Sequence, residues 1–251
     1  MKIKELLAKT SLTSIGREIG LDVQMVEGYL TCTPLDPDDP RYSTDFILPS
    51  MKMVEACRAN NFDFFLPWIE AGKITEEQMH HAAERYHLGK TKSGQPIFWM
   101  IDDMQDPLDA HIGNGWISTL LKKREPLLQS WHPTHCLFGL HLLSEETVAI
   151  VESEASAVVL SELFPESIWL SYATTAHLSP ALFAPLEGRT VTLYPRTDPT
   201  LSTYLFFEEL ADQTRRQYDL DLTVDTTLED HATDSQKERC IDILEFLLDS
   251  L

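Results

Sequence analysis

Three acidic side chains follow short apolar segments in the second half of the chain, where they could bind a metal ion. Glu152 comes directly after TVAIV, Asp198 comes shortly after TVTLY, and Asp225 comes directly after LDLTV. Ligands of open parallel sheets bind beyond the carboxyl ends of the strands, so side chains at these positions can converge on one edge. Hard divalent ions select carboxylate oxygens. The pattern therefore predicts a Mg²⁺ site, which usually serves phosphoryl transfer.

The elements that would position these residues alternate between strands and helices. Apolar segments predict strands at Thr147–Val151, Ser167–Ser171, Thr190–Tyr194 and Leu220–Val224. Helical spacing predicts helices at Ala155–Leu163, Leu201–Arg216 and Gln236–Leu251. Short apolar strands that alternate with helices are typical of a doubly wound parallel sheet. We therefore expect residues 137–251 to form an α/β domain with about four parallel strands.

Two further regions precede this domain. Residues 1–85 are expected to be helical, with Thr75 as the N-cap of one helix. Residues 86–136 are expected to be a β-rich connection, with strands at Tyr86–Leu88 and Pro96–Ile101 joined across KTKSGQ. The expected fold class is thus α/β, with a helical region and a small β-hairpin region ahead of the parallel sheet.

Several strings of residues, taken in order, resemble a known domain family. VAIVESEASAVVLSELFPESIWLS, followed by LEGRTVTLYPRTDP, is similar to a toprim domain, the catalytic fold shared by topoisomerases and bacterial primases. With ERYHLG, PIFWMID, HCLFGLHLL and the tail YDLDLTVDTTLEDHAT, the chain resembles an uncharacterised group of toprim-like, primase-related proteins of bacterial mobile elements over roughly Asn61–Leu251. The resemblance implies that Glu152 is the general acid or base and that Asp198 holds Mg²⁺.

The chain departs from the toprim pattern at this site. Arg196 stands where the pattern has the first aspartate of its Asp-x-Asp motif. A guanidinium cannot ligate a cation, and its charge repels Mg²⁺ at short range. The glycine of the pattern after the second strand is missing, because residues 171–174 are SYAT, and PT follows Asp198 where a small Ala-Gly pair often stands. These departures predict a degenerate site with weak activity or none.

Arg196 and Glu152 each have a second interpretation. Arg196 could grip a phosphate directly, as a fixed cation in place of the metal. It could also form a structural salt bridge with Glu152 or Asp198. Glu152 follows a strand and precedes a helix, where a carboxylate can cap the helix and do nothing else. Asp225 could add a further acidic group or belong to a solvated acidic face.

The N-terminal segment Ser11–Leu30 resembles a helix-turn-helix with Gly20 at the turn. Recognition helices read bases with Arg, Asn or Gln and hold phosphates with Lys or Arg. Gln24 on the second helix and the nearby Arg17 are therefore the candidate DNA-binding residues. That helix has no basic residue, and phosphate contacts supply most of the affinity for DNA, so a plain helical hairpin is the alternative.

Charge and composition limit the partners. Forty acidic and twenty basic side chains give a formal net charge of −20. Such a surface repels nucleic acid and anionic membranes, so nucleic acid is expected only at a local basic patch or a bridging metal, and a protein partner is an alternative. No stretch approaches the roughly 18 apolar residues of a membrane span, and the N-terminus lacks the apolar run of a signal peptide. Four scattered cysteines suit reduced thiols, so we expect a cytoplasmic protein without membrane association.

Three functions follow from these observations. The first is a primase-related toprim-like protein, ancestrally a Mg²⁺-dependent phosphoryl transferase on nucleic acid, with a degenerate metal site. The second is a non-catalytic module that binds a phosphate or a protein. The third is a helix-turn-helix DNA-binding regulator. Zinc is not expected, because the ligands around His135 and Cys136 have no second half with matching spacing.

Overall fold

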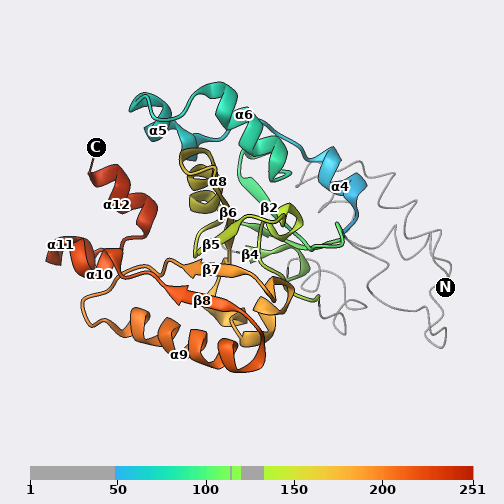
Figure 1. Ribbon diagram of the computed structural model, residues 1–251. Coiled ribbons are helices and arrows are strands. Elements are labelled where there is room, and N and C mark those ends of the chain that lie inside the picture. The colour runs from blue at the N-terminus through green and yellow to red at the C-terminus, as the bar shows by residue number, and fades with distance from the viewer. Residues whose placement is uncertain (1–48, 114, 120–132, 251) are drawn as a thin grey trace, which may run out of the picture. The chain divides into compact units, whose positions relative to one another are not determined.

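The computed structural model describes residues 49–113, 115–119 and 133–250 (Figure 1). The chain divides into two compact units. One contains the described residues up to Asn60 together with those of His87–His135, and is called here the β unit. The other contains Asn61–Tyr86 together with Cys136–Leu251, and is called the α/β unit.

The α/β unit is built on a parallel sheet of four strands. They are β5 (Thr147–Val151), β6 (Ser167–Ser171), β7 (Thr190–Leu193) and β8 (Asp221–Val224), in the order β6-β5-β7-β8. All three neighbouring pairs are parallel, and Val148 of β5 lies opposite Ile168 on one side and Val191 on the other. The expected four-stranded parallel sheet is confirmed, and β5 and β6 have the predicted bounds.

Helices cover both faces of this sheet (Figure 1). The connections contain α8 (Glu154–Leu163), η5 (Thr175–His177), η6 (Pro180–Leu186) and α9 (Ser202–Gln217). Alternate strand residues such as Val148, Ile150 and Leu193 share one core with Phe207 and Leu210 of α9. The strand residues between them face α8, which packs on β5 and β6, because successive side chains of a strand point to opposite faces. Both faces are therefore buried, which explains the nearly continuous apolar strands.

Residues 61–86 pack within the α/β unit, which differs from the expected boundary after residue 85. They form η2 (Asp63–Phe65), α5 (Leu66–Glu70) and α6 (Glu76–Arg85). α6 begins after the predicted N-cap Thr75, whose hydroxyl accepts a 3.1 Å hydrogen bond from the backbone of Gln78. α6 packs against α8, and the buried Tyr86 donates a 2.7 Å hydrogen bond to the carbonyl of Trp169. These contacts bind the segment to the sheet rather than to the residues before it.

A short segment covers the outer edge of β6. Phe138 and Ser171 form an antiparallel bridge with backbone hydrogen bonds of 2.8 and 3.1 Å. η4 (Leu140–Leu142) follows it. Gly139 lies between them at φ +83°, where a Cβ atom would lie 3.1 Å from the carbonyl oxygen of Trp169. Both the backbone conformation and the close approach require glycine here.

The C-terminal segment is broken into three helices, and the expected single helix Gln236–Leu251 is wrong. The helices are α10 (Thr227–His231), α11 (Asp234–Glu238) and α12 (Ile243–Asp249). The break occurs at Cys240, whose φ of +52° lies in the left-handed region. Asp242 then starts α12 as its N-cap and forms a capping box with Glu245, whose backbone donates to the Asp242 carboxylate at 2.8 Å.

The β unit combines helical segments with an antiparallel sheet. Within the described residues these include α4 (Met51–Ala56), β1 (Gly89–Lys90), β2 (Pro96–Ile101), β3 (Pro107–Ile112) and β4 (Gly115–Trp116), with the strands in the order β1-β2-β3-β4, and residues 117–119 are also helical. The prediction of β2 is confirmed, whereas the strand expected at Tyr86–Leu88 is wrong and begins at Gly89. The buried Asp109 of β3 accepts hydrogen bonds from the hydroxyl and the backbone of Ser118 at 2.5 and 3.1 Å, which satisfies a charge that burial would otherwise penalise.

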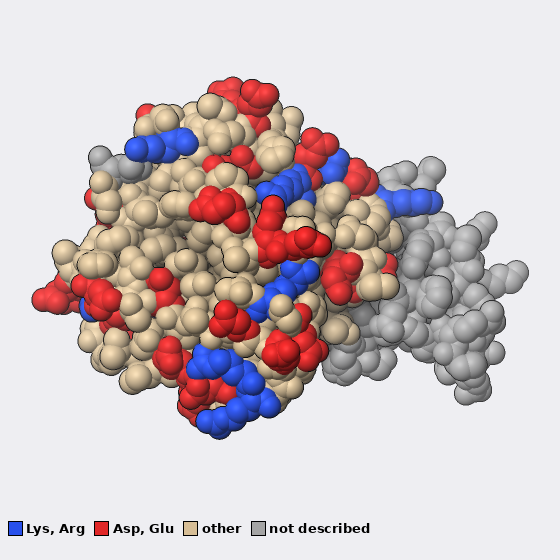
Figure 2. Space-filling view, viewed as in Figure 1, with Lys and Arg blue, Asp and Glu red and all other residues tan. Residues whose placement is uncertain are grey.

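Figure 2 shows acidic side chains in many separate groups among the uncharged side chains that cover most of this face, and basic side chains in fewer groups, the largest at its lower end. This distribution agrees with the net charge of −20. None of the described helices combines the length and apolar character that crossing a bilayer requires.

Candidate functional site

The candidate site lies where the parallel strands end at their carboxyl edge. Glu152 follows β5, Tyr172 follows β6, and Arg196 comes shortly after β7. The chain leaves β5 for β6 on one side, while β7 lies on the other side of β5, so the strand order reverses between β5 and β7. Open α/β sheets bind their ligands at this topological switch point. The strand order thus places Glu152 and Arg196 at the part of the edge where a ligand is expected.

Arg196 and Glu152 form an ion pair across the switch point. The Nε atom of Arg196 lies 2.5 Å from Oε2 of Glu152, and the two side chains are 39% and 26% exposed. The Nε–H bond is not aligned with an acceptor, so the contact is an ion pair rather than a hydrogen bond. Burial acts to lower the pKa of Arg196, but Glu152 raises it above its ordinary value. The structure therefore contains the salt bridge with Glu152, which is one of the alternatives that the sequence allows for Arg196.

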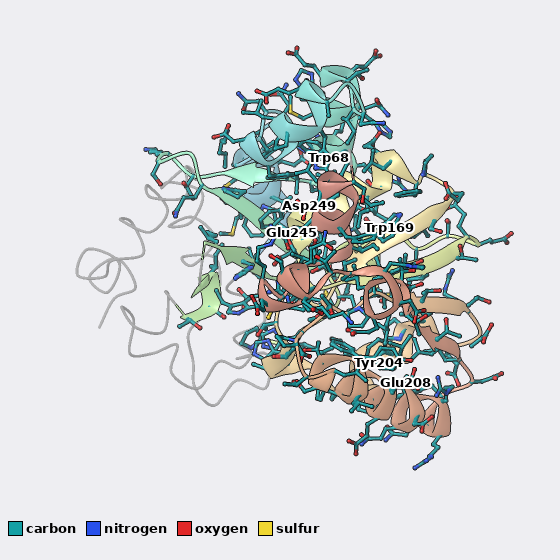
Figure 3. The ribbon with its side chains drawn as sticks, turned by 90° about the vertical axis from the view of Figure 1, so that its left-hand side faces the viewer. Trp68, Trp169, Tyr204, Glu208, Glu245 and Asp249 are labelled. Atoms are coloured by element: carbon teal, nitrogen blue, oxygen red, sulfur yellow. The ribbon has the colours of Figure 1, made fainter. Side chains whose placement is uncertain are left out.

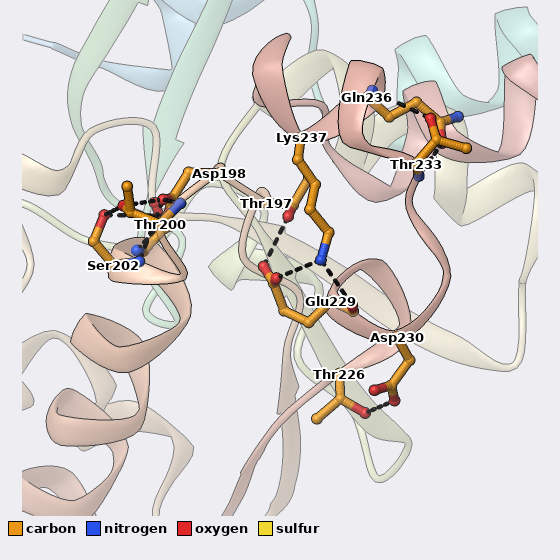
Figure 4. Close-up of polar contacts among 11 residues, drawn as sticks. Thr197, Asp198, Thr200, Ser202, Thr226, Glu229, Asp230, Thr233, Gln236 and Lys237 are labelled. Carbon is orange, nitrogen blue, oxygen red and sulfur yellow. Dashed lines mark hydrogen bonds and ion pairs between the residues drawn. The ribbon is translucent and has the colours of Figure 1, made fainter.

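Asp198 caps α9 (Figure 4). Its carboxylate accepts hydrogen bonds from the backbone of Thr200 at 2.7 Å and of Thr203 at 2.6 Å, and from the hydroxyls of Thr200 and Ser202 at 2.5 and 3.2 Å. Desolvation acts to raise the pKa of Asp198, but these hydrogen bonds hold it well below its ordinary value. No ion pair joins Asp198 to Arg196, although both residues are described. Asp198 therefore performs the capping role that the sequence analysis considered for Glu152.

Asp242 is a carboxylate of this edge that the sequence analysis missed. It is buried, and Ser156 of α8 donates a 2.6 Å hydrogen bond to its Oδ2. The backbone of Thr197 donates to the carbonyl of Ile241 at 3.0 Å, which holds this C-terminal segment against the loop after β7. Asp242 also raises the pKa of Arg196. Its D-I-L-E sequence is a capping-box signal, but nothing in it indicates a place beside the strand ends.

Tyr172 is the second residue that the sequence analysis missed. Its side chain is buried, its ring contacts Phe207 with centroids 5.3 Å apart, and its hydroxyl has no aligned hydrogen-bond partner. Burial raises the pKa of this hydroxyl, and Glu152 raises it further, so the phenol is protonated at neutral pH. Tyr172 is thus a buried, protonated hydroxyl close to both members of the ion pair.

Backbone strain in the α/β unit gathers at the same edge. Its described non-glycine residues with positive φ are Ala173 at +57°, Leu201 at +62° and Cys240 at +52°. Ala173 follows β6 and donates to the carbonyl of Glu152 at 3.0 Å, Leu201 precedes α9, and Cys240 precedes Asp242. Residues in sparsely populated backbone regions cluster at functional sites. Ala173 also lies in the segment where the toprim resemblance predicts a glycine, which would adopt this conformation without strain.

Asp225 does not join the ion pair. It follows β8, and its Oδ1 accepts a 2.9 Å hydrogen bond from the backbone of Thr227 at the start of α10. The neighbouring Glu229 accepts a 2.8 Å hydrogen bond from the hydroxyl of Thr197 and pairs with Lys237 at 3.4 Å (Figure 4). Both acidic residues therefore stabilise loops at the carboxyl edge.

Glu152 and Asp198, the two expected Mg²⁺ ligands, each contact another group of the protein. Over residues 49–113, 115–119 and 133–250, no three or more His, Cys, Asp or Glu side chains gather where they could hold a metal. Glu152 is engaged by a guanidinium and Asp198 by the start of α9. The candidate DNA-binding residues Arg17 and Gln24 lie outside the described residues.

A family model described as "Domain of unknown function (DUF6371)" matches residues 60–197. The matched range contains Glu152, Tyr172 and Arg196 and ends one residue before Asp198. A search of curated proteins finds no match. The family match therefore includes the switch point and its ion pair, but it does not include α9 or the C-terminal helices.

Proposed function

The chain belongs to the DUF6371 family, and from this premise we propose that it is a toprim-like, primase-related protein whose metal site has become an internal ion pair. On this proposal the ancestral protein carried out Mg²⁺-dependent phosphoryl transfer on nucleic acid, and the present fold is a non-catalytic binding module. The observation that carries the proposal is the 2.5 Å contact between Arg196 and Glu152 at the switch point.

The charges explain why the ion pair would end metal-dependent chemistry. A guanidinium carries a permanent positive charge, and it takes the place that a divalent cation would have beside Glu152. A Mg²⁺ ion brought to the same carboxylate would be repelled by Arg196 at a distance of a few ångströms. Asp198, the second expected ligand, would have to give up hydrogen bonds at the start of α9. The proposed loss of metal binding therefore rests on two carboxylates. That of Glu152 is paired with Arg196, and that of Asp198 is hydrogen-bonded to the start of α9.

Calorimetric titration with Mg²⁺ and Mn²⁺ tests this proposal. We expect no saturable binding by the unmodified protein at millimolar metal. Arg196→Asp, which restores the aspartate of the toprim pattern, is expected to create saturable binding that a second change, Glu152→Gln, removes. Arg216→Gln on the exposed side of α9 is the matched control and is expected to leave the titration unchanged. Saturable binding by the unmodified protein that Glu152→Gln weakens would overturn the non-catalytic proposal.

The test of the toprim relationship is separate from the test of lost metal binding. If Arg196→Asp keeps its fold but gains no affinity for Mg²⁺, the strand ends do not have the geometry of a toprim metal site. The non-catalytic proposal would then stand without the toprim ancestry. Circular dichroism and a urea titration of each variant show whether the fold is kept.

Phosphate binding by Arg196 is the second candidate function. Two observations favour it: the guanidinium is partly exposed, and the protonated Tyr172 hydroxyl beside it has no aligned acceptor. Glu152 and Asp242 oppose it, because an anion would have to approach two carboxylates. Titration with inorganic pyrophosphate decides the question. Saturable binding that Glu152→Gln strengthens and Arg196→Gln removes would support this function. No binding by the unmodified protein or by the Glu152→Gln variant would reject it.

The remaining expectations stay predictions. A helix-turn-helix regulator would show salt-dependent DNA binding that Arg17→Ala weakens. A cytoplasmic location is kept as part of the proposal, because the four cysteines are scattered along the sequence and suit reduced thiols.

A further inference from the structure

Three large apolar side chains lie exposed at the beginning of α9. Leu201, Leu205 and Phe206 are 39%, 57% and 45% exposed, and they are called here the α9 patch. Leu201 and Leu205 are four positions apart and lie on one side of the helix, and Phe206 follows Leu205 directly, about 100° further round the helix axis. Single exposed apolar residues are normal, whereas contiguous ones mark interaction sites.

The backbone holds Leu201 on the surface against its own preference. Leu201 occupies the N-cap position of α9 at φ +62°, a conformation that disfavours leucine by about 1–2 kcal/mol relative to the right-handed region. Asparagine or glycine suits both this conformation and this position better. The apolar side chain of Leu201 cannot cap the helix, and Asp198 accepts a hydrogen bond from its first turn instead. A leucine that is exposed, strained and unnecessary for capping is explained by a partner that it contacts.

Phe206 is held in place for such a contact. Its ring packs edge-on against the buried ring of Phe207, with centroids 5.2 Å apart. A side chain already fixed by a neighbour loses less freedom when a partner binds it. Aromatic residues of this kind supply much of the binding free energy in protein interfaces.

The charges around the α9 patch indicate the chemistry of the partner. Glu209 and Asp212 lie exposed further along α9, and Glu208 accepts a 3.1 Å hydrogen bond from the hydroxyl of Tyr204 on the same helix (Figure 3). Of the two basic residues near the end of the helix, Arg215 is already paired with Asp212, and Arg216 lies exposed beside it. Residues 136–251 contain 21 acidic and 6 basic side chains. An acidic surface repels nucleic acid, anionic lipid and a second copy of itself, and it attracts a basic protein segment.

We propose that the α9 patch is a docking surface for a basic amphipathic helix of a partner protein. Apolar residues of that helix, three or four positions apart, cover Leu205 and Phe206, and its Lys and Arg residues face Glu208 and Glu209. The proposal does not depend on the ion pair between Arg196 and Glu152, so metal and pyrophosphate titrations do not bear on it.

Selection from a random peptide library against the full chain tests the proposal. The selected peptides are expected to be rich in Lys and Arg, with apolar residues at helical spacing. A synthetic copy of the most frequent one is then titrated against each protein variant by fluorescence anisotropy. The double change Leu205→Ser with Phe206→Ser is expected to weaken binding by about tenfold or more, the loss typical of central anchors. Leu66→Ser and Met104→Ser, which change exposed apolar residues elsewhere, are the matched controls.

Leu201→Asn separates binding from folding. It should raise the stability of the fold, because asparagine tolerates left-handed backbone, and still weaken the peptide complex severalfold. Raised salt should weaken binding further. Acidic peptides, or equal affinity for the unmodified protein and the serine variants, would overturn the proposal. So would a dimer of the unmodified protein in light scattering that the serine variants break, because the occupant would then be a second copy.

Discussion

The hydroxyl of Ser156 donates a 2.6 Å hydrogen bond to the carboxylate of Asp242, 86 residues later in the chain. The bond joins the first turn of α8 to the residue that starts α12 (Figure 3 labels Glu245 and Asp249 of that helix). It brings the C-terminal segment to the carboxyl edge of the parallel sheet. Asp242 thereby becomes a second carboxylate that acts on Arg196, beside Glu152.

Replacing Asp242 by alanine is expected to destabilise the α/β unit by about 2–3 kcal/mol. The change removes the N-cap of α12, which contributes about 1 kcal/mol, and leaves the buried Ser156 hydroxyl without its acceptor. Urea unfolding followed by circular dichroism measures the loss. Asp234→Ala, in the first turn of the exposed α11, is the control and should cost less than about 0.5 kcal/mol. Equal losses for the two variants would show that Asp242 does not hold the C-terminal segment.

The ion pair between Arg196 and Glu152 is expected to have a coupling energy of about 1 kcal/mol. The two side chains are partly exposed, so the value should lie at the upper end of the range for surface pairs rather than near that of buried ones. A double-mutant cycle with Arg196→Gln and Glu152→Gln measures it. The more exposed pair Arg239 and Asp249 is the comparison and should couple more weakly. A value near zero would mean that the two charges do not stay together in solution.

The contribution of Asp198 to the stability of the fold should decrease as the pH falls. Its pKa is lowered in the folded chain, so its stabilising effect is fully present above the ordinary aspartate pKa and is lost as the pH falls through the lower, folded value. Asp198→Ala should therefore be destabilised at pH 7 by about 1–2 kcal/mol relative to the unmodified protein, and this difference should shrink below about pH 4. Urea unfolding at pH 7 and pH 3 checks it. A difference that is the same at both pH values would contradict the capping role, and Asp212→Ala is the control on the same helix.

Relieving the strain at Ala173 should stabilise the fold. Ala173→Gly removes the penalty of a left-handed conformation, partly offset by the larger freedom of glycine in the unfolded chain, so a gain of about 0.5 kcal/mol is expected. Ala155→Gly within α8 should do the opposite and cost about 1 kcal/mol. Thermal unfolding of both variants provides the measurement. Destabilisation by Ala173→Gly would show that its methyl group packs too well to be lost.

Much of the α/β unit could be predicted from local patterns. Thr147–Val151 and Ser167–Ser171 are apolar, rich in strand-forming residues and bounded by polar ones, and both strands have the predicted bounds. Thr75 was predicted as an N-cap because the first turn of a helix leaves backbone donors that its hydroxyl can accept. The break at Cys240 could not be predicted, because no glycine or proline marks it and the apolar spacing continues across it.

The sequence by itself determined that Glu152 follows one parallel strand and Arg196 another, because strand periodicity and apolar runs are local properties of the chain. Only the tertiary structure decided which groups those side chains meet. The strand order β6-β5-β7-β8 brings Arg196 to Glu152, and the hydrogen bond to Ser156 holds Asp242, from the far end of the chain, at the same edge. Asp198, in contrast, meets the start of α9 through local hydrogen bonds to residues that follow it closely in the sequence. Ion pairs depend on distances of a few ångströms, and residues far apart in sequence reach such distances only when the whole sheet and its connections are formed.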